Sequence, residues 1–432
     1  MSELNPKKYM AAAISQVGRV AGLPPGTHGR EIRKVGIVGA GLMGSGIAVC
    51  FLGAGIPTLL LDQTDEALAQ GRKHVGKALT TLVKRGVIWD DMAKGLQVLL
   101  TTSRDYADLA DCDLIIEAVF ERMDVKRAVF EKLGSIAKAG AVLATNTSGL
   151  DVDQIAVASG RPADVLGLHF FSPAFMMPLL EIVRGKATSP EALKTCLFAS
   201  TIIRKTGVVV GNCPGFAANR MLEGYARESE FLILEGANPE DIDRALTNYG
   251  FPMGPCVMGD MAGLDVRSHY LDALRAAGLV PDDPRYGVLT KALAAAGRLG
   301  QKAGAGNYDY GDDRRTPVPS TKVRAVRDEI AARLGITPRS FTEEEIVLRC
   351  LLPVINEAAK VVDEGMVQQP SDVDVIWIYG YGFPAAKGGP VFQARAMGLE
   401  AVRSALLAHQ KADPTFGAAY WAPSPALDKL FA

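Results

Sequence analysis

The most constraining feature of this sequence is the segment 35–61, in which 27 consecutive residues carry no charged side chain. A run of that length could cross a bilayer as a helix. However, it contains seven glycines and Pro57, and it divides into a β-branched, a glycine-rich and an apolar third. A buried parallel strand, a closely packed helix and a second buried strand produce the same uncharged pattern. We therefore predict that this segment lies in the interior of an α/β domain.

The alternating pattern continues beyond this segment. Short apolar runs alternate with longer amphipathic stretches, as expected where strands and helices follow one another. The predicted strands are residues 34–39, 58–62, 114–118, 141–146, 165–171 and 208–210, and the predicted helices include 45–52, 65–85, 125–137 and 190–205. Such alternation requires right-handed crossover connections. The sequence therefore predicts a doubly wound, mostly parallel sheet.

Length and composition exclude several other classes of protein. The 432 residues suit two or three domains, and 47 basic against 48 acidic side chains leave a formal charge of −1. This balance gives no long-range attraction to nucleic acid or to an anionic membrane. The six cysteines are scattered, and the N-terminus lacks the apolar core of a signal peptide. We predict a cytoplasmic protein with reduced cysteines that binds no metal, nucleic acid or membrane.

Beyond residue 212 the pattern becomes almost entirely helical, and it repeats. The motif Tyr-Gly-Phe-Pro occurs at 249–252 and again at 381–384, and an Asp-x-Asp motif precedes each copy. Two similar helical units can pack on each other as two subunits of a homodimer do, so a monomer with an internal pseudo-dimer is expected. The predicted order is a helical extension or connector (1–30), an α/β domain (31–212), a first helical unit (213–310), a connector (311–340) and a second helical unit (341–432).

Three glycines mark a candidate dinucleotide site. Gly39, Gly41 and Gly44 form a G-x-G-x-x-G motif directly after a predicted strand and before a predicted helix. These glycines allow a tight turn, close approach of the backbone to a pyrophosphate, and close packing of helix on strand. The next strand ends in Asp62, an acid that can bond ribose hydroxyls and repel a 2′-phosphate, and neither of the next two residues is basic. The sequence therefore predicts NAD as the cofactor, and NADP is disfavoured.

A histidine and a glutamate form a candidate reacting pair. His169 lies near the end of the predicted strand 165–171, and Glu181 lies on the next apolar run, so antiparallel pairing would place the two opposite each other. A carboxylate on one imidazole nitrogen fixes the tautomer and stabilises the imidazolium that forms when the other nitrogen takes a proton. That pair could deprotonate an alcohol as hydride leaves its carbon. Spacing alone leaves open that His169 is a hydrogen-bonded core residue.

The motifs together resemble a known family. The segments VGIVGAGLMGSGIA, IIEAVFERMDVK, ATNTSGLDVDQIA, LGLHFFSPAFMMPLLEIV and CPGFAANRML are similar to L-3-hydroxyacyl-CoA dehydrogenases in order and spacing. The segments GQKAGAGNYDY, EEEIVLRCLLPVINEA and YGYGFPAAKGGP resemble the dehydrogenase half of the multifunctional β-oxidation enzymes. The resemblance implies a Rossmann-type NAD-binding domain followed by two helical units. It also implies NAD-dependent oxidation of (S)-3-hydroxyacyl-CoA to 3-oxoacyl-CoA, in fatty acid β-oxidation or its reverse.

The resemblance further implies roles for individual residues. His169 is the general base and Glu181 its partner, Ser148 bonds the substrate's 3-oxygen, and Asn219 and Tyr379 contact the substrate. The implied cofactor-binding residues are Gly39, Gly41, Leu42, Met43, Gly44, Asp62, Val119, Glu121, Lys126, Ser148 and Ser172.

From the residues alone, other roles stay open at these positions. Ser148 or Asp151 could cap the helix that follows, and Asn219 could face solvent. Glu121 and Lys126 would be taken as surface charges without the resemblance.

Departures from the family bear on substrate and partners. Pro178 and Phe175 replace a basic residue and a histidine common among relatives, which alters the expected contacts with acyl chain and CoA. The hydratase domain of the multifunctional enzymes is not seen ahead of residues 1–30, so we expect no hydratase activity.

Two rival interpretations are a dehydrogenase of free hydroxy acids, which typically uses a lysine base, and a scaffold that docks a separate enoyl-CoA hydratase or thiolase. The His169–Glu181 pair favours an acyl-CoA substrate.

Overall fold

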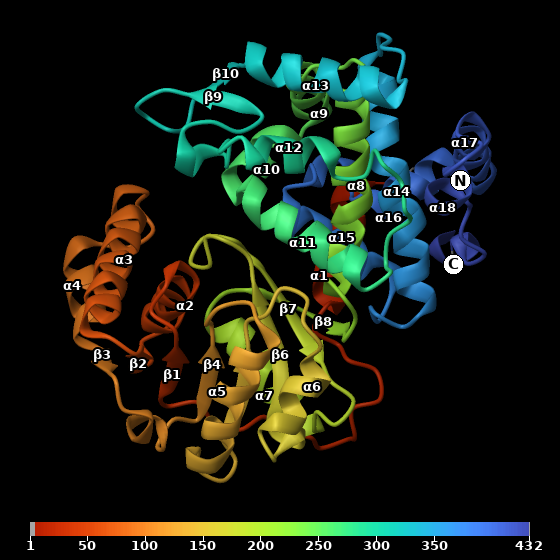
Figure 1. Ribbon diagram of the computed structural model, residues 1–432. Helices are drawn as coiled ribbons and strands as arrows, with labels where there is room; N and C mark the ends of the chain where they lie inside the picture. Colours follow the sequence, from red (N-terminus) through yellow and green to blue (C-terminus); the bar gives the residue numbers. More distant parts are fainter. Residues whose placement is uncertain (1–4, 432) are drawn as a thin grey trace. The chain divides into compact units, whose positions relative to one another are not determined.

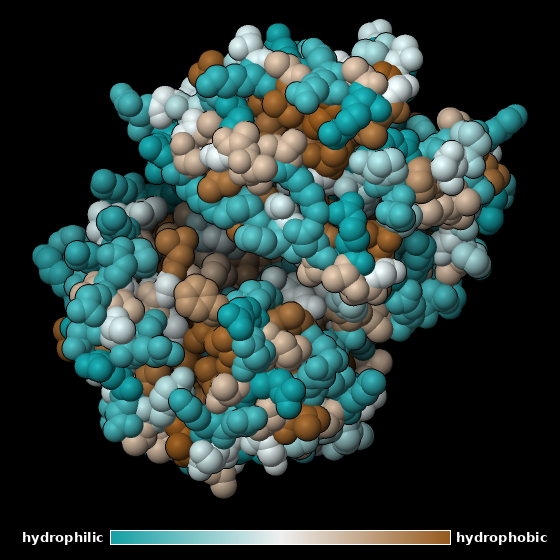
Figure 2. All heavy atoms as spheres, in the orientation of Figure 1, coloured by the Kyte–Doolittle hydropathy of each residue, from teal (hydrophilic) through white to brown (hydrophobic). Residues whose placement is uncertain are grey.

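The computed structural model describes residues 5–431, which divide into two compact units (Figure 1). The α/β unit contains Lys8–Asn219 together with Glu364–Tyr381. The helical unit contains Arg220–Asp363 and the chain from Gly382. Hydrophilic side chains cover most of the visible face, with smaller apolar areas between them (Figure 2). None of the helices in the described part of the chain is long and apolar enough to cross a membrane.

The α/β unit is built on a sheet that has eight strands among the described residues. They are β1 (Val35–Val38), β2 (Thr58–Leu61), β3 (Leu100–Ser103), β4 (Leu114–Glu117), β5 (Val142–Thr145), β6 (Val165–Phe170), β7 (Leu179–Arg184) and β8 (Thr206–Gly211). The order is β3-β2-β1-β4-β5-β6-β7-β8, and only the β6–β7 pair is antiparallel. The predicted doubly wound, mostly parallel sheet is confirmed, and β3 is a strand that the sequence analysis missed.

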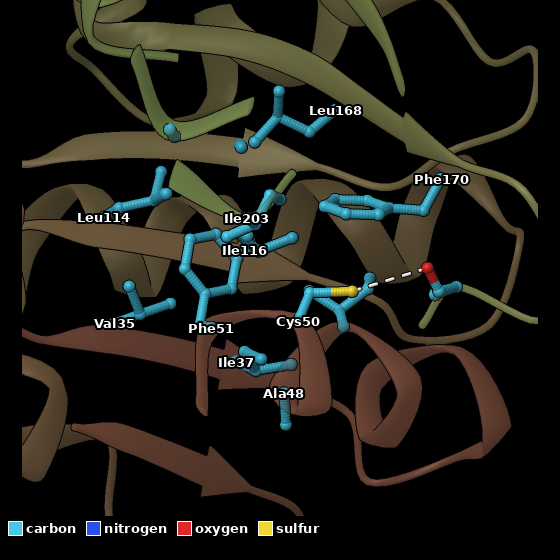
Figure 3. Packing of buried hydrophobic residues seen from close by; sticks show 14 of the residues in the cluster. Val35, Ile37, Ala48, Cys50, Phe51, Leu114, Ile116, Leu168, Phe170 and Ile203 are labelled. Atoms are coloured by element: carbon cyan, nitrogen blue, oxygen red, sulfur yellow. Dashed lines mark hydrogen bonds between the residues drawn. The ribbon is translucent and has the colours of Figure 1, made fainter. Parts of the chain in front are cut away.

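Helices cover both faces of this sheet (Figure 1). One face carries α2 (Leu42–Gly53), α3 (Asp65–Lys84), α4 (Asp90–Val98) and α7 (Pro190–Ile202), and the other carries α5 (Met123–Ile136) and α6 (Val152–Ala158). Figure 3 shows Phe51 of α2 packed with Ile37, Ile116 and Leu168 of the sheet. The uncharged segment 35–61 thus forms β1, α2 and β2, and its lack of charge follows from burial on both sides of the sheet.

A helix from late in the chain completes the α/β unit. The helix α15 (Pro370–Tyr381) lies against β7, because a Cβ added at Gly380 would lie only 2.8 Å from Leu179 Cδ2. The N–H of Gly211 also donates to Met366 O at 2.9 Å. The N-terminal helix α1 (Pro6–Gln16) is tied to α15 by Tyr9, whose hydroxyl donates to Asp374 Oδ2 at 2.5 Å.

The helical unit contains most of both copies of the repeat, but α15 of the second copy belongs to the α/β unit. The helices of the helical unit are most of α8 (Phe216–Leu234), then α9 (Pro239–Tyr249), α10 (Pro255–Ala262), α11 (Leu264–Ala276), α12 (Val288–Ala295), α13 (Thr321–Leu334), α14 (Glu343–Asp363), α16 (Pro390–Met397), α17 (Leu399–Ala412) and α18 (Gly417–Trp421). The strands β9 (Tyr308–Tyr310) and β10 (Pro317–Pro319) form a hairpin. The segment 311–340, predicted as a connector, therefore holds β10 and α13.

The two copies of the repeat use the same kind of tyrosine contact. In the first copy, Asp243 accepts a hydrogen bond from the hydroxyl of Tyr308 at 2.8 Å. It also accepts the backbone N–H groups of Cys256 and Val257. Asp374 stands at the repeated position and accepts the hydroxyl of Tyr9. The N-terminal helix thus supplies to the second copy the contact that the β9 strand supplies to the first.

We predict that Tyr9→Phe lowers the free energy of unfolding by about 1–2 kcal/mol, because the buried carboxylate of Asp374 loses a hydrogen-bond donor. Urea denaturation followed by circular dichroism measures the change. Tyr379→Phe, on the same helix as Asp374, is the matched control and should leave the midpoint unchanged. Equal midpoints for Tyr9→Phe and the wild type would contradict the assigned contact.

Candidate active site

The glycine-rich turn follows β1 and opens α2. Gly39 has φ +107°, and a Cβ there would lie 2.6 Å from Ala118 O. A Cβ at Gly44 would lie 1.9 Å from Gly39 O, so both positions are closed to larger residues. A Cβ at Gly41 would meet nothing within 4 Å. Gly41 is therefore not required by packing within the protein, and it leaves open space before the first N–H groups of α2.

This open space lies where the strand order changes direction. From β1 the sheet continues to β2 and β3 on one side and to β4 and β5 on the other. Ligands of open α/β sheets bind at such a switch point, beyond the carboxyl ends of the strands. The first N–H groups of α2, those of Leu42, Met43 and Gly44, and the positive end of the helix suit a pyrophosphate there. The residues present fit a bound dinucleotide.

Asp62, directly after β2, is hydrogen-bonded to the glycine-rich turn. Its carboxylate accepts hydrogen bonds from the N–H groups of Ala40 and Gln63, both at 2.7 Å. The structure also brings Arg104 close, since its guanidinium donates to Gln63 O at 3.1 Å and lies 3.2 Å from Asp65. This basic side chain is not among the residues directly after Asp62, so the sequence near Asp62 gave no sign of it. Arg104 follows β3, the strand that was not predicted.

His169 and Glu181 lie opposite each other in the antiparallel pairing of β6 and β7. His169 Nδ1 and Glu181 Oε2 are 2.7 Å apart, and Glu181 is fully buried. The other oxygen of Glu181 accepts the N–H of Ala218, in the first turn of α8, at 2.9 Å. The ring of Phe171 lies 4.5 Å from that of His169. The carboxylate is thus satisfied on both oxygens, and Nε2 of His169 has no hydrogen-bond partner within the described part of the chain.

A second polar chain joins three predicted site residues. The side-chain N–H of Asn219 donates to Ser148 O at 3.0 Å, and Asn219 Oδ1 accepts the hydroxyl of Tyr381 at 2.7 Å. Both the N–H and the hydroxyl of Ser148 donate to Glu121 Oε1, at 2.7 and 3.0 Å. Because α6 is capped by Asp151, Ser148 is not needed as its cap. Asn219 is only partly exposed, so the solvent-facing alternative does not describe it.

Lys126 is not the surface charge that its sequence context indicates. It is 1% exposed, and its ammonium lies 2.7 Å from Glu117 and 3.3 Å from Glu121. The Glu117 carboxylate also accepts the N–H of Val119 and the hydroxyl of Thr145. Burial alone would raise the pKa of Glu121, but the charge of Lys126 and the donors on Thr147 and Ser148 lower it. Glu121 is therefore held as a carboxylate beside Ser148.

The remaining predicted site residues include Ser172 and Tyr379, which lie on different elements. Ser172 is exposed in the loop between β6 and β7. Tyr379 lies on α15, but the tyrosine that reaches Asn219 is Tyr381, two residues further on. Side chains two positions apart on a helix point to nearly opposite sides. The repeated Tyr-Gly-Phe-Pro motif, which begins with Tyr381, was the signal that could have identified this residue.

Together these features define a dinucleotide-binding α/β domain with a histidine–carboxylate pair on two neighbouring strands of its sheet. Comparison with known proteins identifies the family. Residues 34–213 match the NAD-binding domain of 3-hydroxyacyl-CoA dehydrogenases, and residues 215–310 and 346–432 match the C-terminal domain of the same enzymes. The chain belongs to the 3-hydroxyacyl-CoA dehydrogenase family, whose members are NAD-dependent oxidoreductases, and the resemblance seen in the sequence is confirmed.

Similar proteins include both long and short relatives. The peroxisomal bifunctional enzyme of Danio rerio is 40% identical over 415 residues, which are 93% of this chain and 56% of that protein. The dehydrogenase part of multifunctional enzyme 1 from C. elegans is 27% identical, with a TM-score of 0.70 over 98% of this chain and 97% of that one. FadB2 of M. tuberculosis is 36% identical, with a TM-score of 0.62 over 65% of this chain and 100% of that one. The chain spans about half the length of the curated relatives it matches.

We predict that Gly44→Ala weakens NADH binding by at least about tenfold, because the added Cβ would push α2 away from Gly39 O. Titration of NADH fluorescence measures the dissociation constant. Gly53→Ala, in the last position of the same helix, is the matched control, since a Cβ there meets nothing within 4 Å. Unchanged NADH binding in a folded Gly44→Ala protein would contradict the assigned site.

Proposed function

We propose that this chain oxidises (S)-3-hydroxyacyl-CoA to 3-oxoacyl-CoA, in fatty acid β-oxidation or its reverse, with His169 as the general base. The observation that carries this proposal is the buried Glu181, whose two oxygens bind His169 Nδ1 and the N–H of Ala218. With Nδ1 held by a carboxylate, the other ring nitrogen, Nε2, is the one that accepts a proton. The family membership supports the reaction class.

The proton step follows from this geometry. His169 Nε2 takes the proton of the substrate's 3-hydroxyl, and the imidazolium that results is stabilised by the adjacent Glu181 carboxylate. The oxygen then forms a carbonyl with C3 as the C–H bond breaks with its electron pair. NAD⁺, when bound at the glycine-rich turn, supplies the hydride acceptor. In the reverse direction His169 returns the proton to the oxygen.

Ser148 and Asn219 would orient the reacting oxygen. The Ser148 hydroxyl donates to Glu121 and so keeps its lone pairs for the substrate hydroxyl. The amide of Asn219 is held at both ends, by Ser148 O and by the Tyr381 hydroxyl, and its rotamer is therefore fixed. A group held in this way can position a substrate without a further loss of rotational entropy. Ser148 and Asn219 act beside His169, and Tyr381 acts through Asn219.

The other expectations from the sequence stay proposals. We propose the cofactor contacts at Asp62, Val119, Glu121, Lys126 and Ser172, and a substrate contact at Tyr379. The domain boundaries, the cytoplasmic location and the monomeric state stay predictions. The same holds for a separate enoyl-CoA hydratase or thiolase as a partner. Relatives bear the names of bifunctional and multifunctional enzymes, which supports an acyl-CoA pathway as the setting.

Incubation of the purified chain with acetoacetyl-CoA and NADH tests the reaction. We expect the absorbance of NADH at about 340 nm to fall with formation of 3-hydroxybutyryl-CoA, since the reverse reaction uses the same groups. NADH consumption with acetoacetate and not with its CoA thioester would support the rival free-acid dehydrogenase. The absence of turnover at every acyl length would contradict the proposal.

We predict that His169→Ala lowers kcat by roughly 10²–10⁴-fold while NADH still binds, because general-base catalysis contributes an effect of that size. Glu181→Gln should also lower kcat, since a neutral amide cannot stabilise the imidazolium. Steady-state kinetics and NADH titration measure both effects. His28→Ala, at an exposed position, is the control and should keep wild-type kcat. A His169→Ala protein with wild-type kcat would show that another group is the base.

A further inference from the structure

The loop that joins the two strands of the reacting pair is a tight turn. His169 and Glu181 are separated by the β6–β7 connection, in which the N–H groups of Met176 and Met177 both donate to Pro173 O, at 2.9 and 3.0 Å. This arrangement directs the carbonyl oxygens of Ala174 and Met177 toward the body of the domain. Carbonyl groups removed from water need donors. The rigidity of the turn therefore depends on the groups that donate to these two carbonyl oxygens.

A single lysine outside the turn donates to both carbonyl groups. Lys205 directly precedes β8. Its ammonium lies 2.5 Å from Ala174 O and 2.5 Å from Met177 O. Within the described residues it has no carboxylate partner. Burial lowers the pKa of Lys205. An unpaired lysine would extend into water, so its position here reflects the turn that it binds.

The same turn contacts the cofactor-binding helix. Cys50 of α2 donates its thiol to Ala174 O at 3.4 Å, the dashed line in Figure 3. A Cβ added at Gly46 would lie 3.2 Å from Ala174 Cβ, so the turn packs directly on α2. Two residues before the turn lies Phe171, whose ring packs on His169. The turn therefore connects the helix that begins the cofactor site to the base.

We propose that Lys205 is a positioning residue for the reaction, holding the 173–177 turn so that α2 and the His169–Glu181 pair keep their relative placement. This inference rests on the proposed function. Lys205 acts through the two carbonyl groups and touches neither substrate nor cofactor. A displacement of about 1 Å between reacting groups lowers the rate by up to about a hundredfold, so a loose turn should affect kcat.

Lys205→Met tests this role, because methionine keeps the length of the apolar stem and removes the donors. Lys205→Arg restores charge and donors, and it has room because Lys205 lines a pocket of about 460 Å³ between α1, α7 and β8. Lys194→Met is the matched control, since Lys194 lines the same pocket and has no bond to the turn. Each variant is measured for kcat and KM with acetoacetyl-CoA, for the NADH dissociation constant, and for the thermal midpoint.

We expect Lys205→Met to lower kcat by about tenfold to a hundredfold, with the NADH dissociation constant changed by less than about twofold. Lys205→Arg should regain most of the wild-type kcat, and Lys194→Met should match the wild type. Wild-type kcat in Lys205→Met, a loss of kcat that Arg does not rescue, or an equal loss in Lys194→Met would each overturn the proposal.

Two further comparisons keep the test decisive. If Lys205→Met does not fold, Lys205→Leu replaces it, and kcat values equal for Leu and Arg overturn the proposal, while a low value for Leu alone supports it. The wild type is assayed first. No turnover by the wild type contradicts the proposed function itself, whereas an active wild type with an equally active Lys205→Met contradicts only the role of Lys205.

Discussion

The site depends on the buried carboxylate of Glu181. Removing a carboxylate from water costs several kcal/mol, and only a full set of hydrogen bonds offsets that cost. Glu181 obtains one from His169, its cross-strand partner, and one from Ala218 in the first turn of α8. A shift of one residue in the β6–β7 register would move Glu181 to the other face of the sheet. The register of these strands and the start of α8 are therefore fixed together.

The start of α8 extends this constraint to Ser148 and Tyr381. Asn219 follows Ala218 directly, and its amide binds Ser148 O in the segment after β5 and the Tyr381 hydroxyl on α15. One helical turn thus holds groups from β7, from the segment after β5 and from α15. The late segment Glu364–Tyr381 belongs to the α/β unit in spite of its distance along the sequence. Its place there follows from these contacts and from the packing of Gly380 on Leu179.

The parts of this arrangement that sequence predicts are the local ones. The glycine-rich turn and its flanking elements lie within a single uncharged segment, and His169 and Glu181 are joined by one short loop. β3 escaped prediction because its four residues are partly exposed and carry no apolar run. Arg104 was missed with it, since only the parallel pairing of β2 and β3 brings Arg104 to Gln63. The burial of Lys126 depends on Glu117, nine residues away on a different element, and helical periodicity contains no sign of it.

The repeat adds an asymmetry that a symmetric homodimer could not have. In a homodimer every substitution appears in both subunits, whereas the copies within one chain can diverge. Here the first copy provides Asn219, and the equivalent position in the second copy is Leu348. The second copy provides Tyr381, while the equivalent Tyr249 packs its ring on Phe251 and Phe383. Each copy thus contributes one half of the Asn219–Tyr381 hydrogen bond, and neither contains both. The duplicated helices therefore form one site in the α/β unit, although the motif occurs twice.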